Sequence, residues 1–470
     1  MRGARERLSC AAIVVALGCV AGPAGAQDAG QAPEASESGG LKPKLTFGID
    51  AKLDFRHSDD DAVVIKFPPI VPPPVTLHTV DPGDHLEISS FALTADAVWS
   101  PGLVGHARVE AANLYDRNPT STGKQVLVKE LWLRFGRETA PATLPDRPRA
   151  YLKAGKFAHF ERQNDRHLES WGLVSTAFNR FEDVGVEAGV DLGRFLYAKA
   201  SYTAGNPLFM RDPNALAGDN GTPTLLQPPP DNVPKLGPGI PILYDTETQD
   251  VGLGTKAQSS VGLGGRWADA TGDVGVDVLA FGRERKLADT VQLEGTFYGG
   301  DLDLLNGPFS TSRFGGPYSL WLENDRKREL GGNLWLYVRD LSVFAQYVDQ
   351  DVAGLKRKGF EAEAAYGFEL PLVWAVGGRQ LFPRLQPAVR YSELKPEKSF
   401  DPTNPGWRGG SPLFPAPSLR WDWRKIDYGL RVTIVSGIDL TLEYSDDRTT
   451  TLANVNVQHN EALVTLHWRM

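Results

Sequence analysis

Cysteine is the scarcest residue of this 470-residue chain, because its only two copies, Cys10 and Cys19, both lie within residues 1–26. A chain processed after that segment has no thiol, which excludes disulfides, zinc–thiolate and iron–sulfur centres, and a cysteine nucleophile. The rest of the sequence lacks any apolar run of about 18 residues, which excludes a helical membrane protein. A formal net charge of -8 excludes a generally basic nucleic-acid binder.

Residues 1–26 have the composition of an export signal. Basic residues come first, an apolar stretch follows over 11–20, and Ala-Gly-Ala at 24–26 provides the small residues of a cleavage site. We therefore expect 1–26 to be a signal peptide. The polar and small residues of 27–43 predict a flexible periplasmic leader. Cys19 follows Ala-Leu-Gly, which leaves lipoprotein processing at that residue as the alternative.

From residue 44 onward, hydrophobic and polar residues alternate over long segments, which is the pattern of β-strands with one apolar face. Such long segments suit strands that cross a membrane at a tilt, since strands of soluble sheets are usually nearer about 5–6 residues. The sixteen predicted strands cover 44–56, 86–99, 103–115, 126–137, 149–158, 182–193, 195–204, 258–269, 273–285, 328–339, 341–350, 358–369, 384–394, 424–435, 438–448 and 459–470.

The connections between these strands alternate in length. Short turns such as 100–102 and 436–437 follow even-numbered strands, whereas long loops such as 205–257 follow odd-numbered ones. Short turns at one rim and long loops at the other, with an even strand count, are typical of bacterial outer-membrane barrels. The sequence thus predicts an all-β protein in which residues 44–470 form a transmembrane antiparallel β-barrel of 16 strands, with long extracellular loops and short periplasmic turns.

Two other folds stay open on the sequence alone. Residues 290–304 also alternate, and counting them together with 316–323 gives 18 strands. We prefer 16, because 18 would place a connector of about a dozen residues on the rim of short turns. An exported soluble β-sandwich or propeller could also supply many strands, but it would leave their long apolar faces in water.

Within 152–191 the chain resembles the phosphate-selective porin O and P family. The matching pieces are Gly-Lys-Phe at 155–157, Glu-Arg at 161–162 and Asp-Val-Gly-Val at 183–186, while Ala-His-Phe stands at 158–160 where the family usually has Pro-Phe-Gly. The resemblance implies a sixteen-stranded trimeric channel whose third loop folds inward. It also implies that arginines and lysines of the lumen make some members anion-selective.

The strand residues of opposite parity to the apolar ones are assigned to the lumen. Basic and acidic residues are nearly balanced there, so the wall as a whole does not select the sign of an ion. The basic candidates of the lumen are Arg108, Arg134, Lys153, Lys199, Arg266, Arg283 and Arg285.

The loop over 159–181 is the predicted constriction, because an inward-folded loop sets the barrier to passage through its charge and width. Its candidate residues are Glu161, Arg162, Asp165, Arg166, His167 and Arg180. Arginine suits phosphate or carboxylate, which its planar donors bind in pairs. Two interpretations stay open: the cluster guides anions, or its charges pair with one another and hold the loop to the wall.

These features predict an outer-membrane porin for the passive diffusion of small hydrophilic solutes, with a preference for anions such as phosphate as the finer hypothesis. We expect no enzymatic activity, cofactor, metal or nucleic-acid partner. The expected partners are membrane lipid, small solutes or ions and, as a homotrimer, further copies of the chain. A barrel enzyme or surface-binding adhesin is the alternative. In such an enzyme, His106 beside Glu110 on one lumen face would be the acid/base pair.

Overall fold

The computed structural model describes the barrel strands and part of their connections. The described residues are 42–59, 63–65, 75–77, 83–113, 126–161, 166–178, 182–205, 208–210, 242–245, 257–286, 291–294, 326–352, 355–397, 422–450 and 456–470. The expected signal peptide at 1–26 and all but the last two residues of the leader at 27–43 lie outside them.

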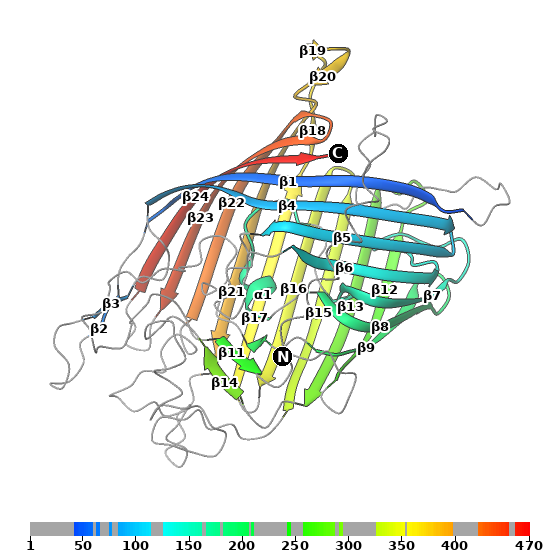
Figure 1. The fold of residues 1–470 in the computed structure, drawn as a ribbon, viewed down its shortest axis with the longest axis horizontal. Coiled ribbons are helices and arrows are strands. Elements are labelled where there is room, and N and C mark those ends of the chain that lie inside the picture. The colour runs from blue at the N-terminus through cyan, green and yellow to red at the C-terminus, as the bar shows by residue number, and fades with distance from the viewer. Residues whose placement is uncertain are drawn as a thin grey trace, which may run out of the picture.

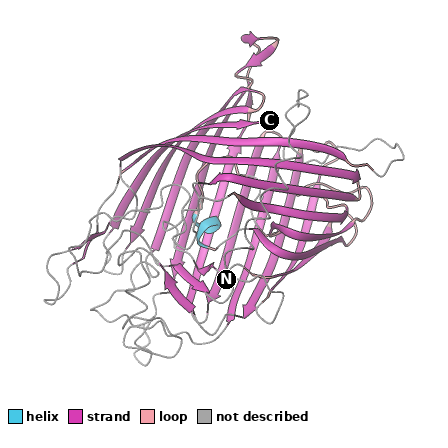
Figure 2. Ribbon diagram, viewed as in Figure 1, coloured by secondary structure: helices cyan, strands magenta, loops and turns pink. Residues whose placement is uncertain are grey.

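Sixteen long antiparallel strands form one closed sheet, seen as a barrel in Figures 1 and 2. They are β1 (Lys44–Ser58), β4 (Gly83–Ser100), β5 (Leu103–Asn113), β6 (Leu127–Gly136), β7 (Ala150–Ala158), β8 (Glu182–Asp191), β9 (Leu196–Thr203), β12 (Gln258–Ala268), β13 (Val274–Lys286), β15 (Arg326–Val338), β16 (Leu341–Val352), β17 (Leu355–Tyr366), β21 (Arg384–Pro396), β22 (Asp422–Val435), β23 (Ile438–Thr450) and β24 (Asn456–Arg469). β18 (Phe368–Glu369) continues β17 along β21. β1 closes the barrel by pairing with both β4 and β24, so the sheet has no open edge in lipid.

The predicted fold class is confirmed, and each predicted segment corresponds to one barrel strand with ends that agree within a few residues. Alternation located the strands because each has one face in lipid and the other in the lumen. The 18-strand alternative is wrong, since β14 (Val291–Glu294) pairs with β11 (Ile242–Asp245) in a small sheet of its own. β10 (Leu208–Met210) completes that sheet, and 316–323 lies outside the described residues.

The two rims of the barrel differ in their connections. Turns such as 101–102 and 436–437 join strands at the rim where the barrel also begins and ends, which is the periplasmic side of an outer-membrane barrel. Two connections of this rim are longer. Residues 137–149 fold against the inner wall, and 367–383 extend into the hairpin of β19 (Trp374–Val376) and β20 (Arg379–Leu381), which stands clear of the barrel in Figure 1. The opposite rim carries the hairpin of β2 (Val63–Ile65) and β3 (Val75–Leu77).

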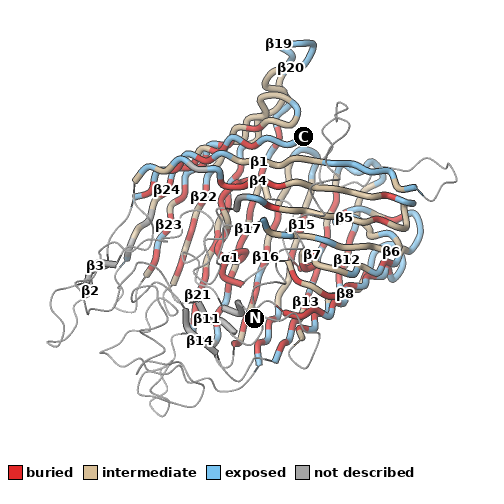
Figure 3. The backbone as a smooth tube through the Cα atoms, viewed as in Figure 1, coloured by how far each residue is buried: buried red, intermediate tan, exposed pale blue. Residues whose placement is uncertain are grey.

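Burial alternates along the strands, as the colours of Figure 3 show. Large apolar side chains exposed on the strands include Leu45, Phe47, Leu263, Tyr428 and Leu442. Charged side chains buried on the strands include Arg56, Glu187, Arg285 and Glu443. Exposed aromatic residues near strand ends include Trp99, Tyr202, Trp267 and Trp468, while Tyr347 and Tyr444 are exposed at mid-strand. The outer face therefore suits a bacterial outer membrane, with aromatic girdles at its interfaces.

One short segment crosses the interior. Residues 166–178, here called the inner segment, contain the helix α1 (Leu173–Ala177), which lies against β16, β17, β21 and β22 (Figure 1). Phe178 at the end of α1 belongs to a buried apolar cluster with Leu394 and Trp423. Gly359 on β17 permits this close approach, because a Cβ there would lie 2.4 Å from the Phe178 ring. No helix of the described residues is long and apolar enough to cross a membrane.

Candidate functional site

The candidate site is the part of the lumen that the inner segment narrows. Of the six residues predicted for a constriction, the structure describes Glu161, Arg166 and His167. Glu161 is buried, and Arg166 and His167 are partly buried. Arg162, Asp165 and Arg180 lie outside the described residues. Their predicted role therefore stays a prediction.

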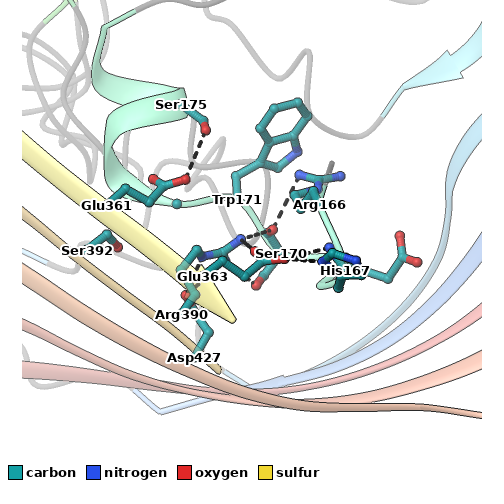
Figure 4. A network of polar contacts seen from close by, with 12 residues as sticks. Arg166, His167, Ser170, Trp171, Ser175, Glu361, Glu363, Arg390, Ser392 and Asp427 are labelled. Carbon is teal, nitrogen blue, oxygen red and sulfur yellow. Dashed lines mark hydrogen bonds and ion pairs between the residues drawn. The ribbon is translucent and has the colours of Figure 1, made fainter. Parts of the chain in front are cut away.

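Arg390 of β21 is the centre of the contacts that hold the inner segment to the wall (Figure 4). Its side chain is fully buried and pairs with Asp427 at 2.8 Å and with Glu363 at 3.5 Å. It also donates to the Ser170 carbonyl oxygen at 2.9 Å and to the Ser170 hydroxyl at 2.7 Å. His167 adds a backbone N–H that donates to Glu363 at 2.6 Å. One guanidinium thus joins two wall carboxylates to the segment.

The start of α1 is fixed by a wall carboxylate. Glu361 of β17 accepts from the Val174 N–H at 3.1 Å and from the Ser175 hydroxyl at 3.3 Å. The first N–H groups of a helix have no partner within the helix, so this carboxylate satisfies a donor that would otherwise be buried and unpaired. The local sequence alone supplies no such cap, since Gly172 precedes the helix.

Glu169 of the inner segment is held between strands from the two ends of the chain. It pairs with Lys52 of β1 at 2.6 Å, with Arg431 of β22 at 3.0 Å and with His467 of β24 at 3.3 Å. Although burial disfavours its charged form, these three groups hold the pKa of Glu169 well below its usual range. The Glu169 N–H also donates to Glu443 of β23. The carboxylate is therefore an anchor of the segment.

Glu161, just before the inner segment, is anchored in the same way. Its carboxylate pairs with Arg283 of β13 at 2.8 Å, and its carbonyl oxygen accepts from Asn333 at 3.0 Å and Gln346 at 2.8 Å. The described carboxylates of this loop therefore hold it to the wall, but they pair with wall cations and not with one another as the second interpretation has it.

Arg166 differs from these anchors. Its guanidinium carbon lies 4.0 Å from the centre of the Trp171 ring, and Nη1 donates to the Ser170 carbonyl oxygen at 3.3 Å. Among the described residues, no carboxylate lies within ion-pair distance of it. Stacking on the indole keeps the cation in place without neutralising it. Arg166 is thus the described residue of the segment that can present positive charge to the lumen.

The wall of β6, β7 and β9 carries a second group of cations. Lys199 Nζ lies 2.8 Å, Arg134 Nη1 3.7 Å and Lys153 Nζ 4.0 Å from the carboxylate of Glu138, in the connection 137–149. Although burial disfavours the charged form of Glu138, Lys199, Lys153 and Arg134 lower its pKa to about 2. Trp132 lies beside this group, with Lys153 Nζ at 5.7 Å and the Arg134 guanidinium at 5.9 Å from its ring centre.

The remaining lumen candidates have close carboxylate partners or are buried. Arg108 pairs with Glu110 at 3.1 Å and with Asp50 at 3.6 Å. Arg266 pairs with Asp191 at 2.6 Å, and Arg283 with Glu161. Arg285 is buried on β13. Parity does not predict which of these residues are buried or paired with a carboxylate, and their role in the lumen stays a prediction.

The acid/base pair considered for an enzyme does not form. His106 Nδ1 lies 2.7 Å from Asp96, on the neighbouring strand, and Glu110 pairs with Arg108 and Lys129. Within the described ranges, no group of three or more His, Cys, Asp or Glu residues could hold a metal ion.

Sequence reasoning missed Glu138, because it lies in a connection and parity assigns only strand residues. Its spacing of four from Arg134 at the end of a strand was the available signal. It also assigned no role to Trp132, which parity places in the lumen and which could equally have been wall packing.

The barrel is similar to solved outer-membrane structures. The outer membrane channel DcaP of Acinetobacter baumannii matches with a TM-score of 0.51 at 9% identity, over 93% of this chain and 100% of that one. OprB of Pseudomonas putida matches with a TM-score of 0.49 at 8% identity, over 91% and 94% of the two chains. No family model matches the sequence, and no curated protein does. At such low identity the likeness to DcaP establishes the fold, that of a bacterial outer-membrane barrel, and the finer resemblance over 152–191 stays a prediction.

Proposed function

We propose that the protein is an outer-membrane channel through which small hydrophilic solutes diffuse passively, with anions favoured at its constriction. The observation that carries this proposal is the inner segment, which is held inside a closed barrel by buried ion pairs. A segment fixed in this way narrows the lumen without relying on its own short helix for stability.

The preference for anions rests on the difference between paired and unpaired charges. The carboxylates Glu161 and Glu169 are consumed by buried contacts with the wall, whereas Arg166 stacks on Trp171 with no described carboxylate beside it. A fixed cation in a narrow, water-poor passage lowers the entry barrier for anions.

Reconstitution of the full chain in planar bilayers tests both parts. We expect discrete conductance steps and, in a salt gradient, a reversal potential on the anion side. Arg166→Gln should shift that potential towards cation preference, more strongly at low salt, where screening is weaker. The matched control is Arg379→Gln, which removes the same charge from the exposed hairpin at the periplasmic rim and should leave the potential unchanged.

Two results would contradict the proposal. Folded protein that opens no channel would favour the barrel enzyme or surface-binding adhesin. If Arg166→Gln and Arg379→Gln change the reversal potential equally, the inner segment does not border the path of the ions.

Phosphate as a favoured anion and a homotrimer as the native assembly are finer parts of this proposal, implied by the resemblance over 152–191. Phosphate should then reduce chloride current at concentrations where sulfate does not. Chemical cross-linking of intact outer membranes should give a band at three times the chain mass.

A further inference from the structure

We propose that Arg134, Lys153 and Lys199 form a binding subsite for the carboxylate of a small organic solute, and that the Glu138 carboxylate competes with the solute for these three cations. This inference deepens the proposed channel function and rests on it. It concerns the wall of β6, β7 and β9, whereas α1 packs on β16, β17, β21 and β22.

The three cations share one face of neighbouring strands. Arg134 of β6 stands directly opposite Lys153 of β7, and Lys153 stands opposite Glu187 of β8. Lys199 of β9 faces Gly189, two residues along β8 from Glu187. This register brings three positive groups to one point of the wall, and the group already there is a carboxylate, that of Glu138. The site is therefore complementary in shape and charge to an organic carboxylate.

The charges that reach water at this point are mainly positive. The side chains of Arg134, Lys153 and Lys199 keep 16%, 12% and 17% of their surface exposed, and that of Glu138 keeps 26%. Glu187 of the intervening strand β8 is buried and pairs with Lys153 at 2.9 Å, whereas Glu130 of β6 is partly exposed and accepts from Trp132 Nε1 at 3.0 Å. Removal of Glu138 alone would leave three partly exposed cations facing the lumen.

Arg134 retains an unused donor. Its Nε is buried and has no hydrogen-bond partner, although one of its Nη atoms faces Glu138. The nearby Trp132 ring covers part of the cluster and limits its access to water, which strengthens the attraction of the cations for an anion.

Glu138 is positioned separately from the wall. It belongs to the connection 137–149, which is tied down by the Thr139 hydroxyl donating to Asp191 at 2.9 Å and the Ala142 N–H donating to Asp277 at 3.2 Å. The backbone beside Glu138 is thus held in place independently of the contacts of its carboxylate with the cations.

A competing carboxylate suits a conducting pore, because a solute must bind strongly enough to enter and weakly enough to leave. Without Glu138, only Glu187 of the described carboxylates would offset the three cations, through its contact with Lys153 at 2.9 Å, and they would hold a dicarboxylate too tightly for rapid release. Glu138 therefore sets the specificity of the subsite: it admits monocarboxylates as passing solutes and weakens the retention of dicarboxylates.

The test compares butyrate and succinate, which have the same carbon count and one or two carboxylates. The half-blocking concentration of each against chloride current is measured on the full-length channel, and binding to purified protein is measured by equilibrium dialysis. Glu138→Gln should tighten succinate binding roughly tenfold, as loss of a competitor for charged hydrogen bonds implies, and butyrate binding less. Lys199→Gln should weaken the binding of both.

Asp96→Asn is the matched control, since it also removes one lumen carboxylate but one that pairs with His106. It should change neither affinity. The inference is overturned if Glu138→Gln behaves as Asp96→Asn does, or if Lys199→Gln leaves both affinities unchanged. A preparation that opens no channels yet shows the expected dialysis pattern would support the subsite and contradict the proposed channel.

Discussion

The two halves of the inner wall contain the same kinds of charged residues in different surroundings. On β17, β21 and β22, beneath the inner segment, Arg390 and its partners Glu363 and Asp427 are at most 1% exposed. On β7 and β9, Lys153 and Lys199 keep 12% and 17% of their side chains exposed. A further layer of chain turns inward-facing charges into anchors, because without water each must find a partner within the protein. Exposure varies within each half, since Arg431 of β22 keeps 15% of its side chain exposed beside Glu169 and Glu187 of β8 is buried, so the contrast is that of Arg390 with Lys153 and Lys199.

The largest expected effect tests the covered half. Arg390→Met leaves Glu363 and Asp427 without their guanidinium and releases Ser170, so it should destabilise the barrel by about 3–5 kcal/mol. Lys199→Met on the other half should cost less than this, because Arg134 and Lys153 remain beside Glu138 when Lys199 is lost. Urea unfolding of both variants in detergent measures the difference. Equal losses would show that cover by the inner segment does not distinguish the two halves.

A smaller loss of stability is expected at the apolar contact between the inner segment and the wall, where Phe178 meets Gly359. Gly359→Ala places a methyl group 2.4 Å from the Phe178 ring, and relief of that overlap should cost about 1–3 kcal/mol and move α1 off the wall. Single-channel recordings should show an altered conductance with more open-channel noise. Gly265→Ala is the control, since its Cβ would meet Leu196 at an ordinary 3.7 Å. A noise level equal in both variants would argue that α1 does not border the pore.

The smallest effect concerns acid. Glu169 in the covered half and Glu138 in the other both have pKa values lowered from the ordinary 4.5, that of Glu138 to about 2. A carboxyl with a lowered folded pKa contributes stability that is present above its unfolded pKa and is lost as pH falls through the folded one. Conductance and selectivity should therefore change little between about pH 7 and pH 5 through these groups.

Nearer about pH 2, protonation of Glu138 should raise anion preference in the parent channel but not in Glu138→Gln. Loss of anion preference on acidification in both proteins would assign the response to another group. Glu169→Gln distinguishes the role of the inner segment from that of Glu138. It weakens the contacts with Lys52 and Arg431, so it should increase open-channel noise at neutral pH without raising anion preference.

The architecture could be predicted from the sequence because the strand period is a local property. Leu45 and Phe47 face outward and Asp54 and Arg56 inward for a reason visible within one strand, namely that lipid accepts only the apolar face. The small sheet formed by β14 could not be separated from a barrel strand by the same signal, since alternation does not say which strand is the partner.

The sequence by itself determined the strands, their facing and the closed barrel they form, because alternation and the lengths of connections are written along the chain. Only the tertiary structure decided which inward charges are anchors. Arg390 and Lys199 are both cations on the predicted lumen face of a strand. Arg390 binds Ser170, which is more than two hundred residues away in the sequence, and Lys199 binds Glu138, which lies in a connection where alternation makes no prediction. Contacts between distant segments decide whether a charged side chain is buried and which residue it pairs with. The electrostatic energy of the charge depends on both.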